Sequence, residues 1–220
     1  MNLSQVLKQI YSKAPLQKKK LKKYIETRSE SFFDEANQFV IDYSSYLDLQ
    51  GLSFNYAIDA YLKMCKDMVK SQIYFMKTEK YPLEDQNQAF EEVYNSKKEM
   101  QPFMVGLALS QYLWSTHYEI FNHLKENFRK NKQKIKKYLE IGPGHGLFFK
   151  EAINTFGNHC KYTAIDISEV SLDLTKSIIS FHKLNYADIK YVNDDMLNIG
   201  SKNLYDFIVM GEVLEHVEEP

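Results

Sequence analysis

The chain is poor in the residues that usually mark small secreted proteins and loop-rich folds. Among 220 residues there are 8 glycines, 5 prolines, 2 cysteines and 1 tryptophan. The cysteines, Cys65 and Cys160, stand far apart and form no C-x-x-C pair, so the sequence implies no disulfide framework. We expect both thiols to be buried and reduced.

Long hydrophobic runs and a strong net charge are also missing. No stretch approaches the ~18 apolar residues of a membrane helix. The N-terminal segment MNLSQVLKQIYSKAP is polar and interrupted, unlike a secretory signal. Formal net charge is -1, so the chain as a whole does not suggest a polyanionic partner. We therefore expect a cytoplasmic protein without a membrane span.

What the chain does contain is an ordinary globular balance, with 44% hydrophobic and 26% charged residues. The length suits one large domain or two small ones. Basic residues cluster at 13–28 and 125–137. We interpret these clusters as solvated helix faces and linkers, and keep a nucleic-acid or anionic-membrane patch as the alternative.

Residues 1–130 carry helical periodicity and no strand-like alternation. Apolar residues recur in steps of three and four at 31–49 and 53–78, which predicts two helices. We expect a shorter helix at 83–98 and a long one at 103–128, with Pro102 in its first turn. The prediction is an all-α N-terminal domain over residues 1–130.

Residues 131–220 have a different period. Short apolar runs at 137–141, 161–166, 189–192 and 204–210 predict strands. Helices are predicted at 145–156 and 168–184, the second opened by Ser168. This alternation predicts an α/β, Rossmann-like domain with about four parallel strands.

Three of the 8 glycines fall in YLEIGPGHG, between a predicted strand and a predicted helix. Gly142 can adopt the turn conformation that a side chain forbids. We expect Gly144 and Gly146 to remove Cβ atoms that would block an adenosine-sized group. The helix that follows offers free N–H donors at its N-terminus.

Acidic residues follow the next two predicted strands. Asp166 ends the second strand, where a carboxylate can accept hydrogen bonds from both ribose hydroxyls. Asp194 and Asp195 follow the third strand. Each alone would be interpreted as a cap or turn residue, but around one glycine loop they favour a nucleoside site.

A nicotinamide dehydrogenase is the natural rival, and the spacing disfavours it. Its loop would have the spacing G-x-G-x-x-G, whereas this loop has G-x-G-x-G and is preceded by Glu140. A carboxylate at that place suits a cationic ligand and would repel a pyrophosphate.

Four segments in order resemble the motifs of class I S-adenosylmethionine-dependent methyltransferases, especially the small-molecule, ubiquinone-pathway branch. They are LEIGPGHG, AIDIS, VNDDM and YDFIVMGEVLEHV, and they cover about 137–220. The resemblance implies S-adenosyl-L-methionine as cofactor and S-adenosyl-L-homocysteine as product. It implies that the cofactor contacts the following residues: Glu140, Gly142, Gly144, Gly146, Asp166, Ile167, Asp194, Asp195, Met196 and Gly211.

The same resemblance implies an in-line methyl transfer, in which the protein aligns the acceptor and excludes water. Residues after the fourth strand are candidates for catalysis, namely Glu212 and, as base or acceptor-orienting group, His216. With Glu215 they form an E-x-x-E-H pattern that some relatives use for a divalent metal, and many others carry without metal. The N/D-P-P-Y/F signature of adenine and glutamine methylation is absent after this strand, which disfavours that branch.

We expect the helical half to wall the acceptor pocket, through Tyr112 and His117. The family's sheet has seven strands, so the resemblance implies a C-terminally truncated domain. Dimerisation or the helical half would then cover the open edge of the fourth strand.

The predicted function is methyl transfer to a small molecule. Two alternatives stay open: an RNA methyltransferase that uses the lysine clusters, and a non-catalytic cofactor-binding or interaction module.

Overall fold

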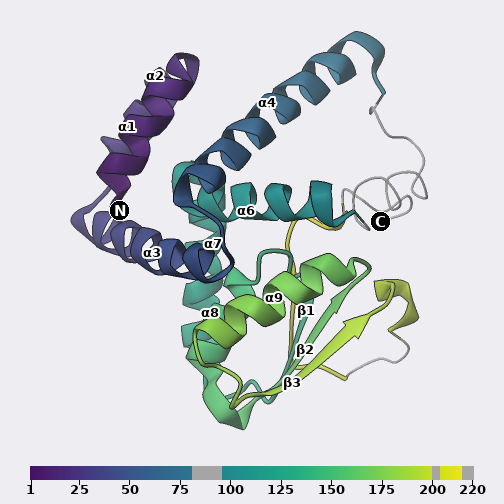
Figure 1. The fold of residues 1–220 in the computed structure, drawn as a ribbon. Coiled ribbons are helices and arrows are strands. Elements are labelled where there is room, and N and C mark those ends of the chain that lie inside the picture. Colours follow the sequence, from purple (N-terminus) through teal and green to yellow (C-terminus); the bar gives the residue numbers. More distant parts are fainter. Residues whose placement is uncertain (81–95, 200–203, 215–220) are drawn as a thin grey trace.

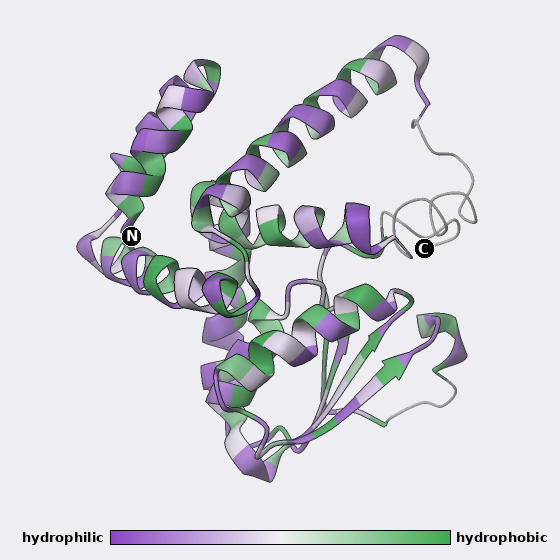
Figure 2. Cartoon of the chain, in the orientation of Figure 1, coloured by the Kyte–Doolittle hydropathy of each residue, from purple (hydrophilic) through white to green (hydrophobic). Residues whose placement is uncertain are grey.

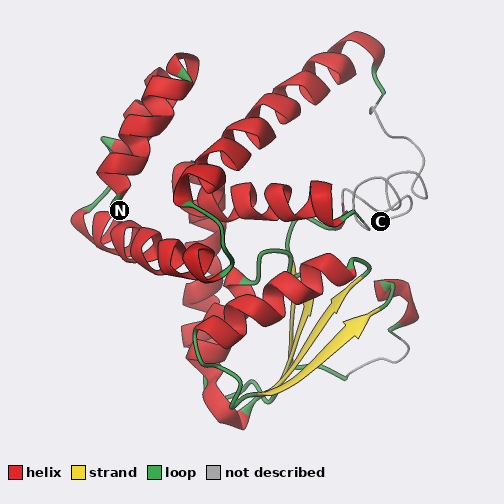
Figure 3. Cartoon of the chain, in the orientation of Figure 1, coloured by secondary structure: helices red, strands yellow, loops and turns green. Residues whose placement is uncertain are grey.

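The computed structural model describes residues 1–80, 96–199 and 204–214, and within them a helical half precedes an α/β half (Figures 1 and 3). The helices of the first half are α1 (Leu3–Lys13), α2 (Pro15–Ile25), α3 (Glu30–Leu49), α4 (Phe54–Thr78), α6 (Lys97–Leu113) and α7 (Ser115–Asn131). None of the helices in these ranges is both long and apolar enough to cross a membrane.

Polar side chains cap the N-termini of several of these helices. Asn2 forms a reciprocal capping box with Gln5 at α1. Ser29 and Ser53 accept backbone N–H groups at the starts of α3 and α4. The helices predicted at 31–49 and 53–78 are thereby confirmed, while most of the helix predicted at 83–98 lies outside the described residues.

The single helix predicted at 103–128 is wrong, because two helices, α6 and α7, meet at Trp114. Trp114 has an extended backbone, with φ -117° and ψ 130°. Its indole N–H donates to the Tyr61 hydroxyl of α4 at 2.9 Å. This tertiary hydrogen bond fixes a bend that no glycine or proline signals.

Pro102 also stands elsewhere than predicted, inside α6 and not in its first turn. A proline at this place leaves one helical carbonyl without its usual donor. The packing of α6 against α4, its most extensive helix partner, stabilises the helix despite that loss.

The second half contains a four-stranded sheet whose strands all run parallel. It comprises β1 (Lys137–Ile141), β2 (Lys161–Asp166), β3 (Asp188–Asn193) and β4 (Phe207–Met210) in the order β3-β2-β1-β4. Helices α8 (Leu147–Phe156) and α9 (Glu169–Phe181) connect successive strands, and short 3-10 turns lie at Gly157–His159 (η2) and Met196–Asn198 (η3). The predicted α/β, Rossmann-like fold with a helical N-terminal region is confirmed.

The two faces of the sheet are covered differently. Tyr138 and Tyr162 point to the face that packs with α8, because both contact the Phe149 ring. Leu139, Ile141 and Ile165 form a small separate cluster on the other face. Successive side chains of β1 point to opposite faces of the sheet, which produces this division.

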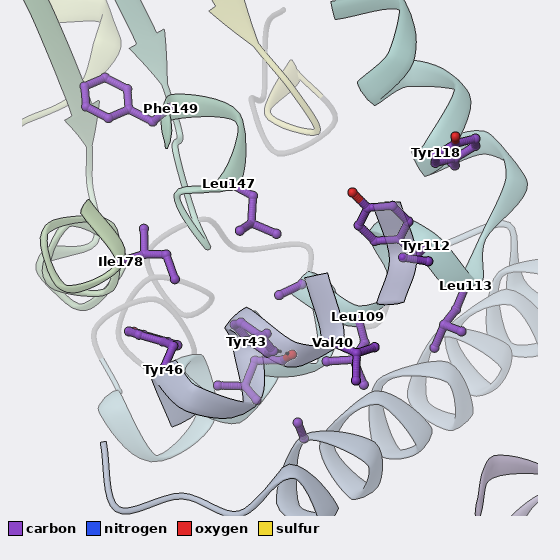
Figure 4. Packing of buried hydrophobic residues seen from close by; sticks show 14 of the residues in the cluster. Val40, Tyr43, Tyr46, Leu109, Tyr112, Leu113, Tyr118, Leu147, Phe149 and Ile178 are labelled. Carbon is purple, nitrogen blue, oxygen red and sulfur yellow. Dashed lines mark hydrogen bonds between the residues drawn. The ribbon is translucent and has the colours of Figure 1, made fainter. Parts of the chain in front are cut away.

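One hydrophobic core joins the two halves (Figure 4). The Tyr46 ring of α3 meets the Phe181 ring of α9 edge-on, with centroids 5.6 Å apart. Val40, Leu109, Leu147 and Ile178 belong to the same buried cluster. Figure 2 shows that the helices around it carry both hydrophobic and hydrophilic residues. The division at residue 130 stays a prediction, but the halves share their core.

Helices α4 and α6 approach so closely that one position tolerates only glycine. A Cβ atom added at Gly106 would lie 2.8 Å from the backbone carbonyl carbon of Ala60 and the backbone nitrogen of Tyr61. Backbone atoms cannot rotate away as a side chain can. Gly106 therefore fixes the spacing of these helices.

We expect Gly106→Ala to lower the free energy of unfolding by about 1–3 kcal/mol, the usual range for overpacking. In an unpacked helix the same change would be stabilising by roughly 0.5–1 kcal/mol, so the sign itself distinguishes the two effects. Urea unfolding measures the difference. Asn55→Ala, at an exposed position of α4, is the control. A stabilised Gly106→Ala chain would contradict the close contact.

Candidate active site

A large cavity lies at the carboxyl ends of the strands, between the sheet and helices α4 and α6. Its volume is about 1460 Å³. Pockets for one small ligand commonly measure about 300–1,000 Å³, so this cavity has room for two. It includes the ends of β1 and β4, where the strand order reverses and open α/β sheets bind their ligands.

The glycine loop forms one wall of the cavity. Gly142 and Gly144 have positive φ angles of 65° and 52°, a conformation that side chains disfavour. The loop is tied to its surroundings: the Gly142 N–H donates to the Ile165 carbonyl at 2.9 Å, and the Thr175 hydroxyl donates to the Gly144 carbonyl at 3.2 Å. Its backbone is thus held in place beside the cavity.

The role predicted for Gly146 needs correction, because this glycine is not among the cavity's lining residues. A Cβ atom there would lie 2.6 Å from Ile178 Cγ2 and 3.0 Å from Thr175 Cα. Gly146 therefore allows α8 to start close against α9, and does not clear space for a ligand.

Asp166 lies at the cavity on the end of β2, as predicted. Its Oδ1 accepts the Ser168 N–H at 2.8 Å. Burial raises its pKa to about 6, against the opposing effect of the backbone N–H groups of Ser168 and Gly144. Above that pH the carboxylate is ionised and can accept hydrogen bonds from hydroxyl groups.

Asp194 and Asp195 line the same cavity and also organise their own turn. Asp194 Oδ1 accepts from the Asn198 amide and from the Asp195 N–H, each at 2.8 Å, and both bonds lower the pKa of Asp194. Asp195 Oδ1 caps the short turn η3 at Leu197 N–H. The two acids therefore shape the wall that follows β3.

Glu140 is the most deeply buried acid of the cavity wall, only 3% exposed. Its Oε2 accepts the Tyr138 hydroxyl at 2.5 Å. Burial raises its pKa to about 8, and the hydrogen bond from Tyr138 opposes this. A cation bound nearby would favour the ionised form.

Acidic groups dominate the charge of the cavity. Its only basic lining residue among the described ones, apart from two histidines, is Lys63, whose Nζ lies 3.2 Å from Asp67 and 3.8 Å from Glu99. The acidic lining residues are Asp67, Glu99, Glu140, Asp166, Asp194, Asp195 and Glu212. The cavity therefore favours cations over polyanions.

The apolar part of the wall is rich in methionine. Of the chain's 8 methionines, all except Met1 line this cavity. They are Met64, Met68, Met76, Met100, Met104, Met196 and Met210. Thioether side chains are flexible and polarisable, which suits apolar ligands of varied shape.

Of the two residues predicted to wall the acceptor pocket, the structure places only His117 at the cavity. The prediction for Tyr112 is wrong: it packs between Phe39 and Tyr118, with ring centroids 4.9 and 5.8 Å away. Figure 4 shows Tyr112 beside Tyr118 in the core. Its stretch of α6 is buried on nearly every side, so helical spacing could not distinguish core from pocket there.

The polar lining residues that the sequence analysis did not single out include Gln111 and His145. Gln111 is 3% exposed, and its Nε2 has no hydrogen-bond partner within the described ranges. His145 lies inside the glycine motif itself. Histidine at the fourth position of G-P-G-H-G was the one signal that could have marked it.

Some of the remaining predicted residues line the cavity, and the others lie outside the described residues. Ile167, Met196, Gly211 and Glu212 line the cavity. Glu215 and His216 lie outside the described residues. In the part of the chain that the structure describes, no group of three His, Cys, Asp or Glu side chains could hold a metal, and the E-x-x-E-H prediction, with two members outside that part, stays a prediction.

The raised pKa of Glu140 predicts how stability depends on pH. The folded chain holds a proton on Glu140 up to about pH 8, whereas the unfolded chain releases it near the ordinary value of 4.5. The stability that this proton maintains is full below pH 4.5 and is lost as pH rises toward 8. We expect Glu140→Gln to abolish this loss of stability with rising pH. Above pH 8 the free energy of unfolding of the variant should exceed that of the wild type by about 2–4 kcal/mol.

Urea unfolding across this pH range, with the exposed Glu126→Gln as control, measures the effect. An equal difference between Glu140→Gln and wild type at every pH would contradict it.

Comparison with known families gives one domain match. A family described as "Methyltransferase domain" matches residues 139–220, which include the glycine loop and every predicted site residue except those of α6 and α7. A curated relative, the mitochondrial ubiquinone biosynthesis O-methyltransferase of Schizosaccharomyces pombe, is 29% identical over 85 residues. The match covers 39% of this chain and spans 30% of that relative.

Solved structures give more distant likenesses. The N-methyltransferase NodS of Bradyrhizobium japonicum, in complex with S-adenosyl-L-homocysteine, has 20% identity and a TM-score of 0.43, over 62% of this chain and 61% of NodS. An O-methyltransferase family protein of Burkholderia thailandensis has 14% identity and a TM-score of 0.46, over 66% of this chain and 40% of that one. The domain match covers the α/β half alone and does not extend to residues 1–138.

Proposed function

We propose that the chain binds S-adenosyl-L-methionine and transfers its methyl group to a small-molecule acceptor, because residues 139–220 match a methyltransferase-domain family and carry motifs that resemble those of class I S-adenosylmethionine-dependent methyltransferases. One observation carries the proposal. The cavity that holds the glycine loop and Asp166 continues without a break into a methionine-rich chamber under α4 and α6. A cofactor and an acceptor would thus occupy one continuous cavity.

The residues of the cavity fit the cofactor's chemistry. Asp166 would accept the ribose hydroxyls, and Asp194, Asp195 and Met196 would flank the adenine. Glu140, buried in the acidic wall of the cavity, would face the positive charge of the cofactor. When bound, the cofactor supplies a methyl group on a positively charged sulfur, ready for in-line displacement. The chain's own part is to align the acceptor and exclude water.

The charge of the cavity supports a small, uncharged or cationic acceptor over RNA. The first basic cluster lies largely on α2, which is remote from the sheet in Figure 1. In the second cluster, Lys125 is buried and its Nζ lies 2.6 Å from Glu35. RNA affinity would weaken steeply with added salt, so a salt-insensitive acceptor affinity would count against the RNA alternative.

A binding module without turnover is the other alternative. Steady release of S-adenosyl-L-homocysteine in the presence of an acceptor would exclude it.

We expect calorimetry to show micromolar binding of S-adenosyl-L-methionine and S-adenosyl-L-homocysteine. Asp166→Asn keeps the shape of the side chain and removes its charge. It should weaken both affinities at least about tenfold, since hydrogen bonds to a charged group contribute about 1.5–3 kcal/mol. Asp173→Asn, at an exposed α9 position paired with Lys176, should bind like the wild type. No binding by the folded wild type, or equal binding by Asp166→Asn, would contradict the proposed site.

A further inference from the structure

We infer that the acceptor presents a hydroxyl group, which His117 binds and deprotonates while His145 donates a hydrogen bond to its oxygen. This inference rests on the proposed function, and it names the acceptor's chemistry. It depends on residues at positions 110, 111 and 117, which the matched domain does not include. Four observations support it, beginning with the proton positions on the two imidazoles.

The hydrogen bonds of Ser110 fix the proton on His117. The Ser110 hydroxyl lies 2.5 Å from the Leu107 carbonyl oxygen and 2.8 Å from His117 Nδ1. A carbonyl only accepts, so the single hydroxyl proton of Ser110 lies toward Leu107. His117 Nδ1 must then donate its own proton to Ser110 Oγ. Its Nε2 consequently carries a lone pair, the form that acts as a base.

The glycine loop fixes the opposite arrangement on His145. The Leu147 N–H donates to His145 Nδ1 at 3.2 Å, so that nitrogen carries the lone pair. Burial, and secondarily the nearby His117, lower the pKa of His145 to about 4. His145 is therefore neutral near pH 7 and has its proton on Nε2. Within the described residues, neither Nε2 atom has a hydrogen-bond partner.

The two imidazoles thus offer complementary groups to one cavity. His117 provides an acceptor and His145 a donor, and both residues line the wall. A hydroxyl satisfies both at once, because its proton goes to His117 and its oxygen accepts from His145. Burial lowers the pKa of His117 as well, which keeps it neutral and able to take a proton.

Gln111 supplies a third polar group at the same wall. Its buried Nε2 has two N–H donors and no partner within the described ranges. A buried donor without a partner is destabilising, so a ligand oxygen that accepts from it would be favoured. The surroundings are apolar, including Trp114, whose ring meets the His117 ring edge-on at 4.7 Å. The expected acceptor is therefore a largely apolar molecule with a hydroxyl at one end.

The step balances in atoms and charge. His117 Nε2 takes the hydroxyl proton while the oxygen forms a bond to the methyl carbon, and the carbon–sulfur bond breaks with its electrons going to sulfur. The positive charge moves from sulfur to the imidazolium of His117, which then releases its proton to solvent. The products are a methyl ether and S-adenosyl-L-homocysteine.

Binding without cofactor tests the recognition step. The two probes are para-octylphenol and para-octylanisole, its methyl ether, in which a methyl group replaces the hydroxyl proton. Nuclear magnetic resonance of labelled histidines should show the Nδ1–H form of His117 in the free chain. The phenol, and not the ether, should shift the Nε2 signal of His117, while the exposed His123 of the same helix stays unchanged. An Nε2–H form of His117, or equal shifts with both probes, would overturn the inference.

Turnover tests the base. His117→Gln keeps an acceptor oxygen and removes basicity, so we expect octylphenol to bind within a few-fold of wild type and its methylation to fall at least about a hundredfold. A nitrophenol that is already ionised needs no base, and its methylation should fall only a few-fold. His123→Asn is the control for histidine loss on α7. Equal losses with both phenols would overturn the role as base.

Three more outcomes separate this inference from the proposed function. Ser110→Ala should broaden the tautomer signal of His117 and slow octylphenol methylation without changing cofactor affinity. Methylation of para-octylaniline but not of octylphenol would refute the hydroxyl class. Failure to bind S-adenosyl-L-methionine would instead refute the proposed function, whatever the phenol does to His117.

Discussion

The pairing of β1 with strands on both sides is the constraint on which the site depends. Parallel hydrogen bonding joins β1 to β2 on one edge and to β4 on the other. The chain must therefore leave β1 at the place where the sheet changes direction, and a crossover helix must start within a few residues. The positive φ angles at Gly142 and Gly144 make that departure sterically feasible, and the cavity forms where α8 and the segment after β4 diverge.

The helical half completes this cavity because its core is continuous with that of the sheet. α6 packs against both α4 and α9, and Gly106 sets how near α4 can come. Trp114 then bends the chain and binds Tyr61, so α7 turns back with His117 facing the same space as the glycine loop. The two halves are thus joined by one packing arrangement, and neither alone encloses the space.

The sequence predicted those features that depend on local chemistry. Strand bounds at β1 and β2, the Ser168 cap of α9 and the positions of Asp166 and Asp194 follow from residue patterns read a few positions at a time. Features decided by tertiary contact could not be predicted in this way. The bend at Trp114 comes from a partner 53 positions away in the chain. Tyr112 and His117 have similar sequence surroundings, yet one packs against α3 and the other lines the cavity, and Gly146 faces α9 instead of a ligand.

The methionine wall has a consequence for how such a cavity would select its ligands. Thioether chains bend to follow whatever apolar surface they meet, so a wall made of seven of them discriminates poorly by contour. Discrimination then falls to the few rigid polar groups, whose unmet hydrogen bonds penalise any ligand that cannot satisfy them. The cavity would recognise the polar end of a ligand strictly and its apolar body loosely.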